Sequence, residues 1–152
     1  MSLAHSTLTL TRNVAATPAR VFAMWKEPEE RVVWGAPFEG VTMTYTATDF
    51  SEGGHEVCEC KMPDGETFTV KTNYYNLVPD QRLVFTEALH AEGANLGVSL
   101  VSVDIAPAGE GVTLTVHIQS VALDGSGFEH EVEGGWSNAL DAFVARATAV
   151  PA

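Results

Sequence analysis

The chain has 152 residues, and its 8 Lys and Arg are outnumbered by 20 Asp and Glu, which gives a formal net charge of −12. This length favours one domain over residues 1–152, and a hydrophobic content of 45 % is typical of a packed globular protein rather than a disordered one. The negative charge repels phosphate backbones and anionic lipid surfaces, so we expect neither nucleic-acid binding nor membrane insertion.

Two cysteines, Cys58 and Cys60, lie two residues apart in an extended stretch, so their side chains should share one strand face. Zinc sites usually need four ligands, and the histidines show no ligand-like spacing, so we interpret the thiols as core residues and expect no metal and no cofactor. Residues 1–10 contain no secretory apolar segment and the chain has no run of 18 apolar residues, which predicts a cytoplasmic protein with reduced thiols.

Short runs of alternating apolar and polar residues, separated by turn signals, predict seven strands. Pro63, Asp64 and Gly65 mark a hairpin turn, and a second turn covers residues 78–81, with Pro79 at a position that suits a type I turn. Sequential strands with short links are typical of an antiparallel meander. The expected strands cover residues 7–14, 41–50, 55–62, 67–77, 82–89, 96–105 and 112–121, with a loop over 90–95.

Two short helices are expected between the first and second strands. Thr17 is a good N-cap, and Pro18 suits the first helical position. This helix should end before Pro28, because the residue preceding a proline avoids the helical region. A second short helix over 28–33 then delivers Trp34 to a loop.

The last predicted element is a long amphipathic helix over 128–150, which at about 1.5 Å per residue is long enough to cross a sheet. Ser126 and Glu129 have the spacing of a capping box. Gly134 and Gly135 each cost roughly 1 kcal/mol relative to Ala, so we expect a close backbone or a bend there. The apolar side contains Phe128, Val132, Trp136, Leu140, Phe143, Val144 and Ala147.

A curved sheet that closes on one terminal helix encloses space between them. We therefore predict an α+β fold with an internal cavity, which is the usual place for a small ligand, and we expect a small hydrophobic ligand as partner. A homodimer is also possible, formed through the exposed face of the sheet or through an edge strand, although no residue specifies one.

Alternation with a period of two assigns the inward face of each strand. Glu56 shares a face with Cys58, Cys60 and Met62, which is the more apolar and therefore the inward face. The other inward sets are Phe68, Val70, Thr72, Tyr74 and Asn76; Leu83, Phe85, Glu87 and Leu89; and Val112, Leu114, Val116 and Ile118.

Glu56 is the sharpest polar candidate. Burial would disfavour its charged form, and perturbed groups cluster at functional sites. Alternatively, Glu56 lies near the strand end and reaches water, or it pairs with a basic neighbour. Glu87 carries the same ambiguity.

Six short motifs follow one another along residues 9–147. They are Pro18-x-x-Val21-Phe22-x-x-Trp25, Val33-Trp34-x-x-Pro37, Gly53-Gly54, Met62-Pro63-Asp64-Gly65-x-x-Phe68, Pro79-x-x-Arg82-Leu83-Val84-Phe85-Thr86 and Gly135-Trp136-x-x-x-Leu140. In this order they resemble Hsp90-ATPase-activator-homologue-1-like proteins of the START/Bet v 1-like helix-grip (SRPBCC, polyketide cyclase-like) superfamily. The resemblance implies a seven-stranded antiparallel sheet around the C-terminal helix, with two small helices after the first strand. Superfamily relatives bind lipids, steroids or polyketides, and some act as aromatase/cyclases.

Three functions remain open. The first is binding of a small hydrophobic or amphipathic ligand. The second is a cyclase, dehydratase or hydrolase-type enzyme with Glu56 as general base and Tyr74 as proton donor or orienting group, although no nucleophile elbow or phosphate-binding motif occurs. The third is a chaperone-regulating interaction module, which predicts an exposed apolar patch. The expected ligand-binding residues are Trp34, Glu56, Cys58, Tyr74, Phe85, Trp136 and Leu140.

Overall fold

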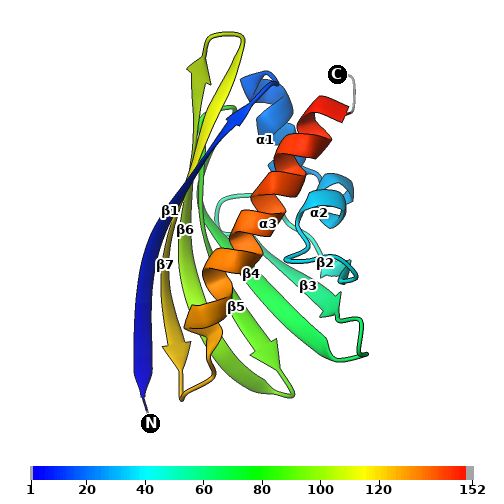
Figure 1. Cartoon of the computed structure of the whole chain (residues 1–152), viewed down its shortest axis with the longest axis vertical. Coiled ribbons are helices and arrows are strands. Elements are labelled where there is room, and N and C mark those ends of the chain that lie inside the picture. The colour runs from blue at the N-terminus through cyan, green and yellow to red at the C-terminus, as the bar shows by residue number, and fades with distance from the viewer. Residues whose placement is uncertain (1, 150–152) are drawn as a thin grey trace.

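The seven strands form one antiparallel sheet, as predicted, and their order across the sheet is β1-β7-β6-β5-β4-β3-β2 (Figure 1). The protein is described here by a computed structural model that covers residues 2–149. Chain order gives β1 (Leu3–Val14), α1 (Pro18–Lys26), α2 (Pro28–Trp34), β2 (Thr42–Ala47), β3 (His55–Lys61), β4 (Thr67–Val78), β5 (Arg82–Ala91), β6 (Ala94–Ala108), β7 (Gly111–Leu123) and α3 (Phe128–Ala149).

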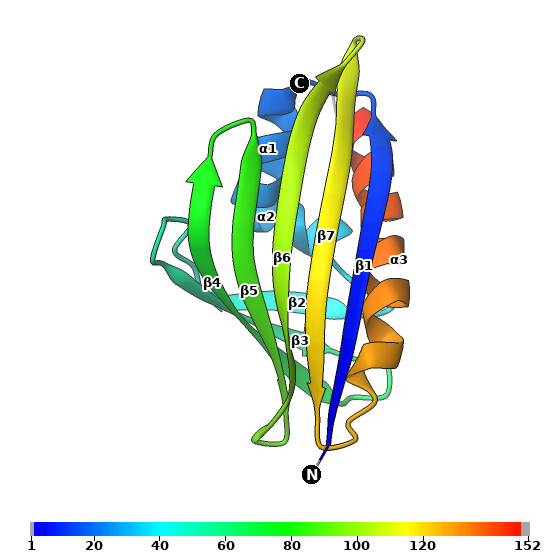
Figure 2. The ribbon, with the colours of Figure 1, turned by 90° about the vertical axis from the view of Figure 1, so that its left-hand side faces the viewer.

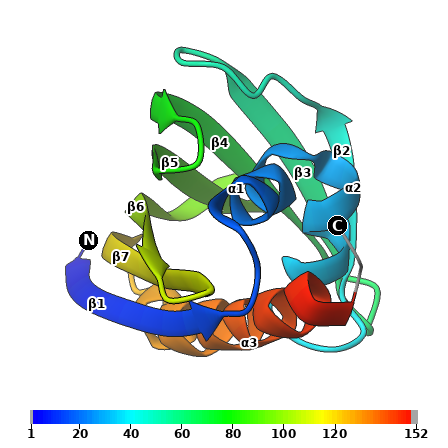
Figure 3. The same cartoon turned by 90° about the horizontal axis from the view of Figure 1, so that it is seen from above.

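The sheet is strongly bent around its helices. Seen from above, it forms an arc from β1 to β2, with α1 inside the arc and α3 across its open side (Figure 3). Figure 2 shows the outer surface of the long strands, with β2 and β3 crossing behind them at a steep angle. This is the helix-grip arrangement, and it leaves the concave face of the sheet directed at α3. No helix within residues 2–149 is long and apolar enough to cross a membrane.

The two short helices form as their sequence signals predict. The Oγ1 atom of Thr17 accepts a hydrogen bond from the backbone N–H of Arg20 at 3.1 Å, and Pro18 occupies the first turn of α1. Glu27 then adopts an extended conformation, and α2 begins at Pro28. The close succession of α1 and α2 places both helices over one end of the concave face (Figure 1).

The predicted loop over 90–95 is wrong, because β5 and β6 continue into a tight hairpin. Ala91 pairs with Ala94, and the turn consists of Glu92 and Gly93. Both turn residues have positive φ angles, of 53° and 79°, which is the backbone conformation that two-residue hairpins require. Longer strands extend the concave face beyond the residues that alternation alone identified.

The predicted inward faces of β3 and β7 are confirmed by burial. On β5, burial confirms Leu83 and Phe85, and the other two inward residues, Glu87 and Leu89, border the space enclosed by the sheet and α3. On β4 the prediction holds as far as Tyr74 and is wrong at Asn76, because the register shifts between these two residues. The side chain of Asn76 bonds instead to Glu52 and Arg82, while Leu77 packs against the core. A bulge of this kind inserts one residue and reverses the faces beyond it.

The start of α3 packs closely on β6. A Cβ atom on Gly97 would overlap the Phe128 ring, so only glycine admits that ring at this position. The predicted capping box is not formed, because the Oγ atom of Ser126 donates to the carbonyl of Leu96 at 2.7 Å while accepting from the N–H of Phe128. Among residues 2–149, Oε1 of Glu129 has no hydrogen-bond partner. The predicted helix end at Val150 lies outside the described residues.

Candidate ligand-binding cavity

A cavity of about 570 Å³ lies between the concave face of the sheet and α3, as the sheet-and-helix pattern predicts. Its wall includes inward residues of β3, β4 and β5, the end of α2, and one side of α3. Five of the seven expected ligand-binding residues lie on this wall: Trp34, Cys58, Tyr74, Phe85 and Trp136. Glu56 and Leu140 do not reach it; Leu140 is fully buried in the core.

All three tryptophans of the chain line the cavity. Trp25 stands at their centre, with ring centroids 4.7 Å from Trp34 in an edge-on arrangement and 6.2 Å from Trp136 in a stacked one. The indole N–H of Trp34 donates to the carbonyl of Met24 at 2.9 Å, which fixes that ring. Packed aromatic rings of this kind give a ligand site a large, rigid apolar surface.

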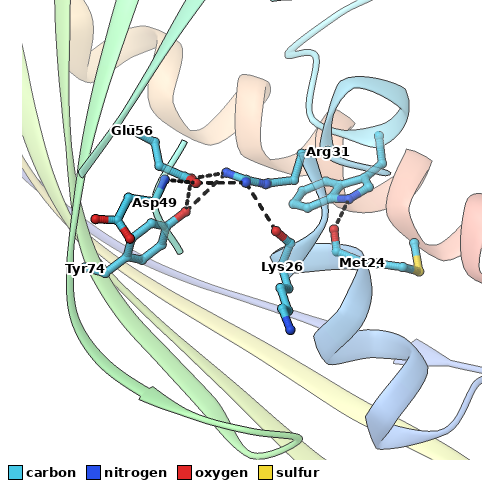
Figure 4. Close-up of polar contacts among 7 residues, drawn as sticks. Met24, Lys26, Arg31, Asp49, Glu56 and Tyr74 are labelled. Carbon is cyan, nitrogen blue, oxygen red and sulfur yellow. Dashed lines mark hydrogen bonds and ion pairs between the residues drawn. The ribbon is translucent and has the colours of Figure 1, made fainter. Parts of the chain in front are cut away.

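A buried polar cluster fastens α2 to the sheet (Figure 4). Arg31 of α2 contacts both carboxylate oxygens of Glu56 on β3, and its Nη2 atom lies 3.2 Å from Oε2. The Tyr74 hydroxyl on β4 donates to Oε1 of the same carboxylate and lies 3.2 Å from Nη1 of Arg31. The backbone N–H of Asp49, between β2 and β3, donates to Oε2 at 3.0 Å.

The surroundings of Arg31 keep its charge. Burial is the largest single effect and lowers the pKa of Arg31, but the hydrogen bond that Arg31 donates to Glu56, together with the charge interactions with Tyr45, Tyr74 and Glu56, raises this pKa overall. Its Nη2 atom also donates to the carbonyl of Lys26 at the end of α1, and its guanidinium lies 4.5 Å from the centre of the Tyr45 ring. Burial raises the pKa values of Tyr45 and Tyr74, so both phenols stay neutral at physiological pH.

The cluster decides between the alternatives stated for Glu56. This side chain is 1 % exposed and is paired with a basic neighbour, so it does not reach water. Both of its oxygens accept hydrogen bonds from within the protein. Tyr74 and Glu56 are brought together as the enzyme hypothesis requires, but they are directed at each other and at Arg31.

Sequence reasoning missed Arg31. A charged residue in a helical turn next to apolar Val32, Val33 and Trp34 was the available signal, because a basic residue amid apolar neighbours often neutralises a buried acid. Which acid it meets depends on how α2 lies against β3. Neither element's pattern contains that information.

Glu87 lies on the cavity wall, and its carboxyl group makes no hydrogen bond or ion pair within residues 2–149. It is partly buried and lies on the inward face of β5. Burial raises the pKa of Glu87 to about 7, and the opposite effect of the nearby Arg31 charge is smaller. Glu87 therefore changes its charge near neutral pH.

Cys58 and Cys60 are buried free thiols on the cavity wall. The neighbouring Cys60 thiol, together with burial, raises the pKa of Cys58, which keeps that thiol protonated. In the described part of the chain no group of three or more His, Cys, Asp or Glu residues is placed to hold a metal ion.

Known proteins share this architecture. The family model described as Activator of Hsp90 ATPase homolog 1-like protein (AHSA1) matches residues 15–148. Among solved structures, Mll3558 from Rhizobium loti superposes with a TM-score of 0.84 at 29 % identity, with 95 % of this chain and 99 % of that one covered. A protein from Rhizobium leguminosarum gives 0.77 at 27 % identity, covering 95 % and 97 %. CV1439 from Chromobacterium violaceum gives 0.82 at 23 % identity, covering 93 % and 96 %, which is a likeness of fold.

A comparison with curated proteins gives no match. The family match covers most of the chain, and the helix-grip fold is common to the solved structures above. The chain belongs to the Activator of Hsp90 ATPase homolog 1-like family, with a Bet v 1-like helix-grip fold.

Proposed function

We propose that the protein binds a small hydrophobic or amphipathic ligand in the cavity between the sheet and α3. The observation that carries this proposal is the cavity itself, whose volume of about 570 Å³ lies within the usual range for small-molecule sites. A side-chain-filled core would leave no such space, because protein interiors are packed as densely as organic crystals.

The composition of the wall supports an apolar ligand. Residues such as Val70, Leu83, Leu89 and Phe85 come from the sheet, and Trp136 comes from α3. Transfer of apolar surface from water into such a wall is favourable by roughly 25 cal/mol per Å². A ligand that covers these residues gains most of its affinity from this term.

The polar cluster supports a site that exists before the ligand arrives. Arg31 joins α2 to β3 through Glu56 and to β4 through Tyr74, so the helix is held over the cavity. A preformed site binds more tightly than one that must be ordered by the ligand, since less conformational entropy is lost.

Binding is favoured over the enzyme that uses Glu56 and Tyr74. A general base must lie within hydrogen-bond reach of the proton that it removes. Glu56 is not part of the cavity wall, and its oxygens are occupied by Arg31, Tyr74 and the Asp49 N–H. Substrate in the cavity would have to displace these partners first.

Intrinsic fluorescence gives a direct test, because every tryptophan of the chain borders the cavity. Titration with the uncharged probe N-phenyl-naphthylamine should produce energy transfer from tryptophan that saturates at one probe per chain. Val70→Phe, on the wall, should weaken this binding at least tenfold by filling space.

Val84→Phe is the matched control, because Val84 alternates with the inward residues Leu83 and Phe85 and so faces away from the cavity. This variant should bind the probe like the wild type. Circular dichroism and thermal unfolding verify that both variants are folded. A non-saturable signal in the wild type, or equal weakening by the two substitutions, would contradict the proposal.

A further inference from the structure

We propose that Glu87 anchors a protonated amine on the bound ligand, so that the preferred ligand is an amphipathic cation with an apolar body. This inference rests on the proposed function and specifies the ligand's chemical class. It comes from the position of Glu87 in the sheet, from its lack of a partner, and from the charge balance of the cavity wall.

Glu87 lies in the middle of a polar row that crosses the sheet on its inward face. Strand register pairs Glu87 with Thr72 on one side and with Ser99 on the other. Thr72 in turn pairs with Glu56, and Ser99 pairs with Ser120. Neighbouring inward residues on the same strands are apolar, including Val70, Phe85 and Leu89. The polar groups therefore occupy one level of an otherwise apolar wall.

The other residues of the row either form polar contacts within the protein or border the cavity. Glu56 is paired with Arg31, and the hydroxyl groups of Ser99 and Ser120 lie 2.8 Å apart. Thr72, Glu87 and Ser99 all border the cavity. Glu87 is the member with a titratable group and no partner within residues 2–149, so its unmet need is for a hydrogen-bond donor in the cavity.

The charges around Glu87 favour a cation as that donor. Arg31 is neutralised by Glu56, which leaves the Glu87 carboxylate as the uncompensated charge of this part of the wall. A buried carboxylate is strongly stabilised by an opposite charge, and charge-assisted hydrogen bonds are about twice as strong as neutral ones. The overall net charge of −12 also attracts cations toward the protein.

The remaining ionisable groups near Glu87 do not supply this charge. Tyr45 of β2 and Cys60 of β3 lie close enough for the Glu87 charge to raise the pKa of each. Neither side chain can carry a positive charge, so neither can serve as a counter-ion for Glu87. His130 and Glu131 border the cavity from α3 and are exposed. Rings of Tyr45, Phe85 and Trp136 on the wall are compatible with a cation, since aromatic faces attract positive charge.

A series of four ligands with one apolar body tests the inference: naphthylmethylamine, naphthylmethanol, methylnaphthalene and naphthoic acid. Isothermal titration calorimetry at a pH well above 7 should rank the amine first and the acid last. Glu87→Gln should weaken the amine by roughly 10- to 100-fold and leave methylnaphthalene within about threefold. The matched control is Glu59→Gln, which makes the same change on an exposed position of β3 and should alter neither.

The pH dependence of amine binding distinguishes an ion pair with Glu87 from a fit of the ligand's shape to the cavity. Amine affinity of the wild type should fall as the pH is lowered through about 7, where Glu87 takes up a proton, and the profile of Glu87→Gln should be flat over this range. Arg31, Tyr45 and Cys60 are unchanged in that variant, so they serve as an internal control for the other titratable groups that face this position.

The outcomes distinguish this inference from the proposed function. If the wild type binds none of the four ligands, ligand binding itself is contradicted. If it binds all four with similar affinity, or if the amine preference survives in Glu87→Gln, the cavity binds ligands but Glu87 is not their anchor.

Discussion

Glu56 and Glu87 flank the same residue, Thr72, in the cross-strand register, yet within residues 2–149 only Glu56 of the two has an ion-pair partner. The two carboxylates are thus in one polar row with opposite roles. Glu56 binds Arg31 and so holds α2 against the sheet, whereas Glu87 borders the cavity and is accessible to a ligand there. The position of α2 produces this difference, because it delivers one arginine to one of the two acids.

Removal of one partner from the buried pair should strongly destabilise the fold. Arg31→Met leaves the Glu56 carboxylate buried without a counter-ion, which typically costs about 3–5 kcal/mol. Urea unfolding followed by far-UV circular dichroism measures the loss. Asp141→Asn is the control, since the Arg12–Asp141 pair involves an Asp side chain that is 67 % exposed and exposed pairs contribute about 1 kcal/mol or less. Similar losses in both variants would show that Arg31 and Glu56 do not form the structural pair described.

Glu87 should make stability fall as the pH rises. Its pKa is about 7 in the folded chain and near 4.5 when unfolded, so between these values the folded state binds more protons. The stabilising contribution is present below pH 4.5 and is lost as the pH rises through 7.

Glu87→Gln should therefore match the wild type at low pH and exceed it above pH 7. The difference should reach about 1–3 kcal/mol, as one pH unit between the two pKa values corresponds to about 1.4 kcal/mol and water in the cavity reduces the effect. Chemical denaturation of both proteins across this pH range measures it. A difference that is constant with pH would show that Glu87 titrates normally.

The fold follows closely from local patterns in the sequence. Alternation on β3, β5 and β7, the Thr17-Pro18 start of α1 and the apolar side of α3 each depend on residues a few positions apart. The sequence-based predictions were wrong at two places where the structure depends on the backbone conformation of single residues. The Glu92-Gly93 hairpin requires two positive φ angles, and the bulge near Asn76 requires an inserted residue, which a period-two pattern does not reveal.

The site was predicted less completely, for a physical reason. Alternation identified inward residues such as Cys58, Tyr74 and Phe85, and these line the cavity. Which acid pairs with Arg31, however, depends on residues far apart in the sequence, because the packing of α2 against the sheet determines it. The sequence singled out Glu56 ahead of Glu87 but left the environment of both acids open, and only the fold shows which of them is paired.

Gly134 and Gly135 should respond differently to alanine. A Cβ atom on Gly134 would meet nothing within 4 Å, whereas one on Gly135 would lie 3.2 Å from the Cβ atom of Pro37. Gly134→Ala should raise the unfolding free energy by up to about 1 kcal/mol through helix propensity. Gly135→Ala should give a smaller gain or a loss, since the Pro37 loop must move. Thermal unfolding compares the two variants, and a larger gain at Gly135 would contradict this close approach.

Gly97 should tolerate no side chain. Its Cβ atom would overlap the Phe128 ring and lie 2.8 Å from the carbonyl oxygen of Val121. Gly97→Ala should cost about 1–3 kcal/mol, as overpacked sites generally do. Gly93→Ala offers no matched comparison because of its positive φ, so Ala94→Ser at the exposed hairpin end is the control and should be neutral. Wild-type stability in Gly97→Ala would show that α3 does not begin against β6 as described.

The most direct test of the central claim locates a bound ligand by nuclear Overhauser effects. Isotope-filtered spectra of the labelled protein with naphthylmethylamine should show contacts from the naphthalene protons to the methyl groups of Val70 and Leu89, which are cross-strand partners on β4 and β5 and both border the cavity. Contacts confined to exposed surface residues such as Val32 and Val33, or no intermolecular contacts at saturating ligand, would contradict binding in the space beneath α3.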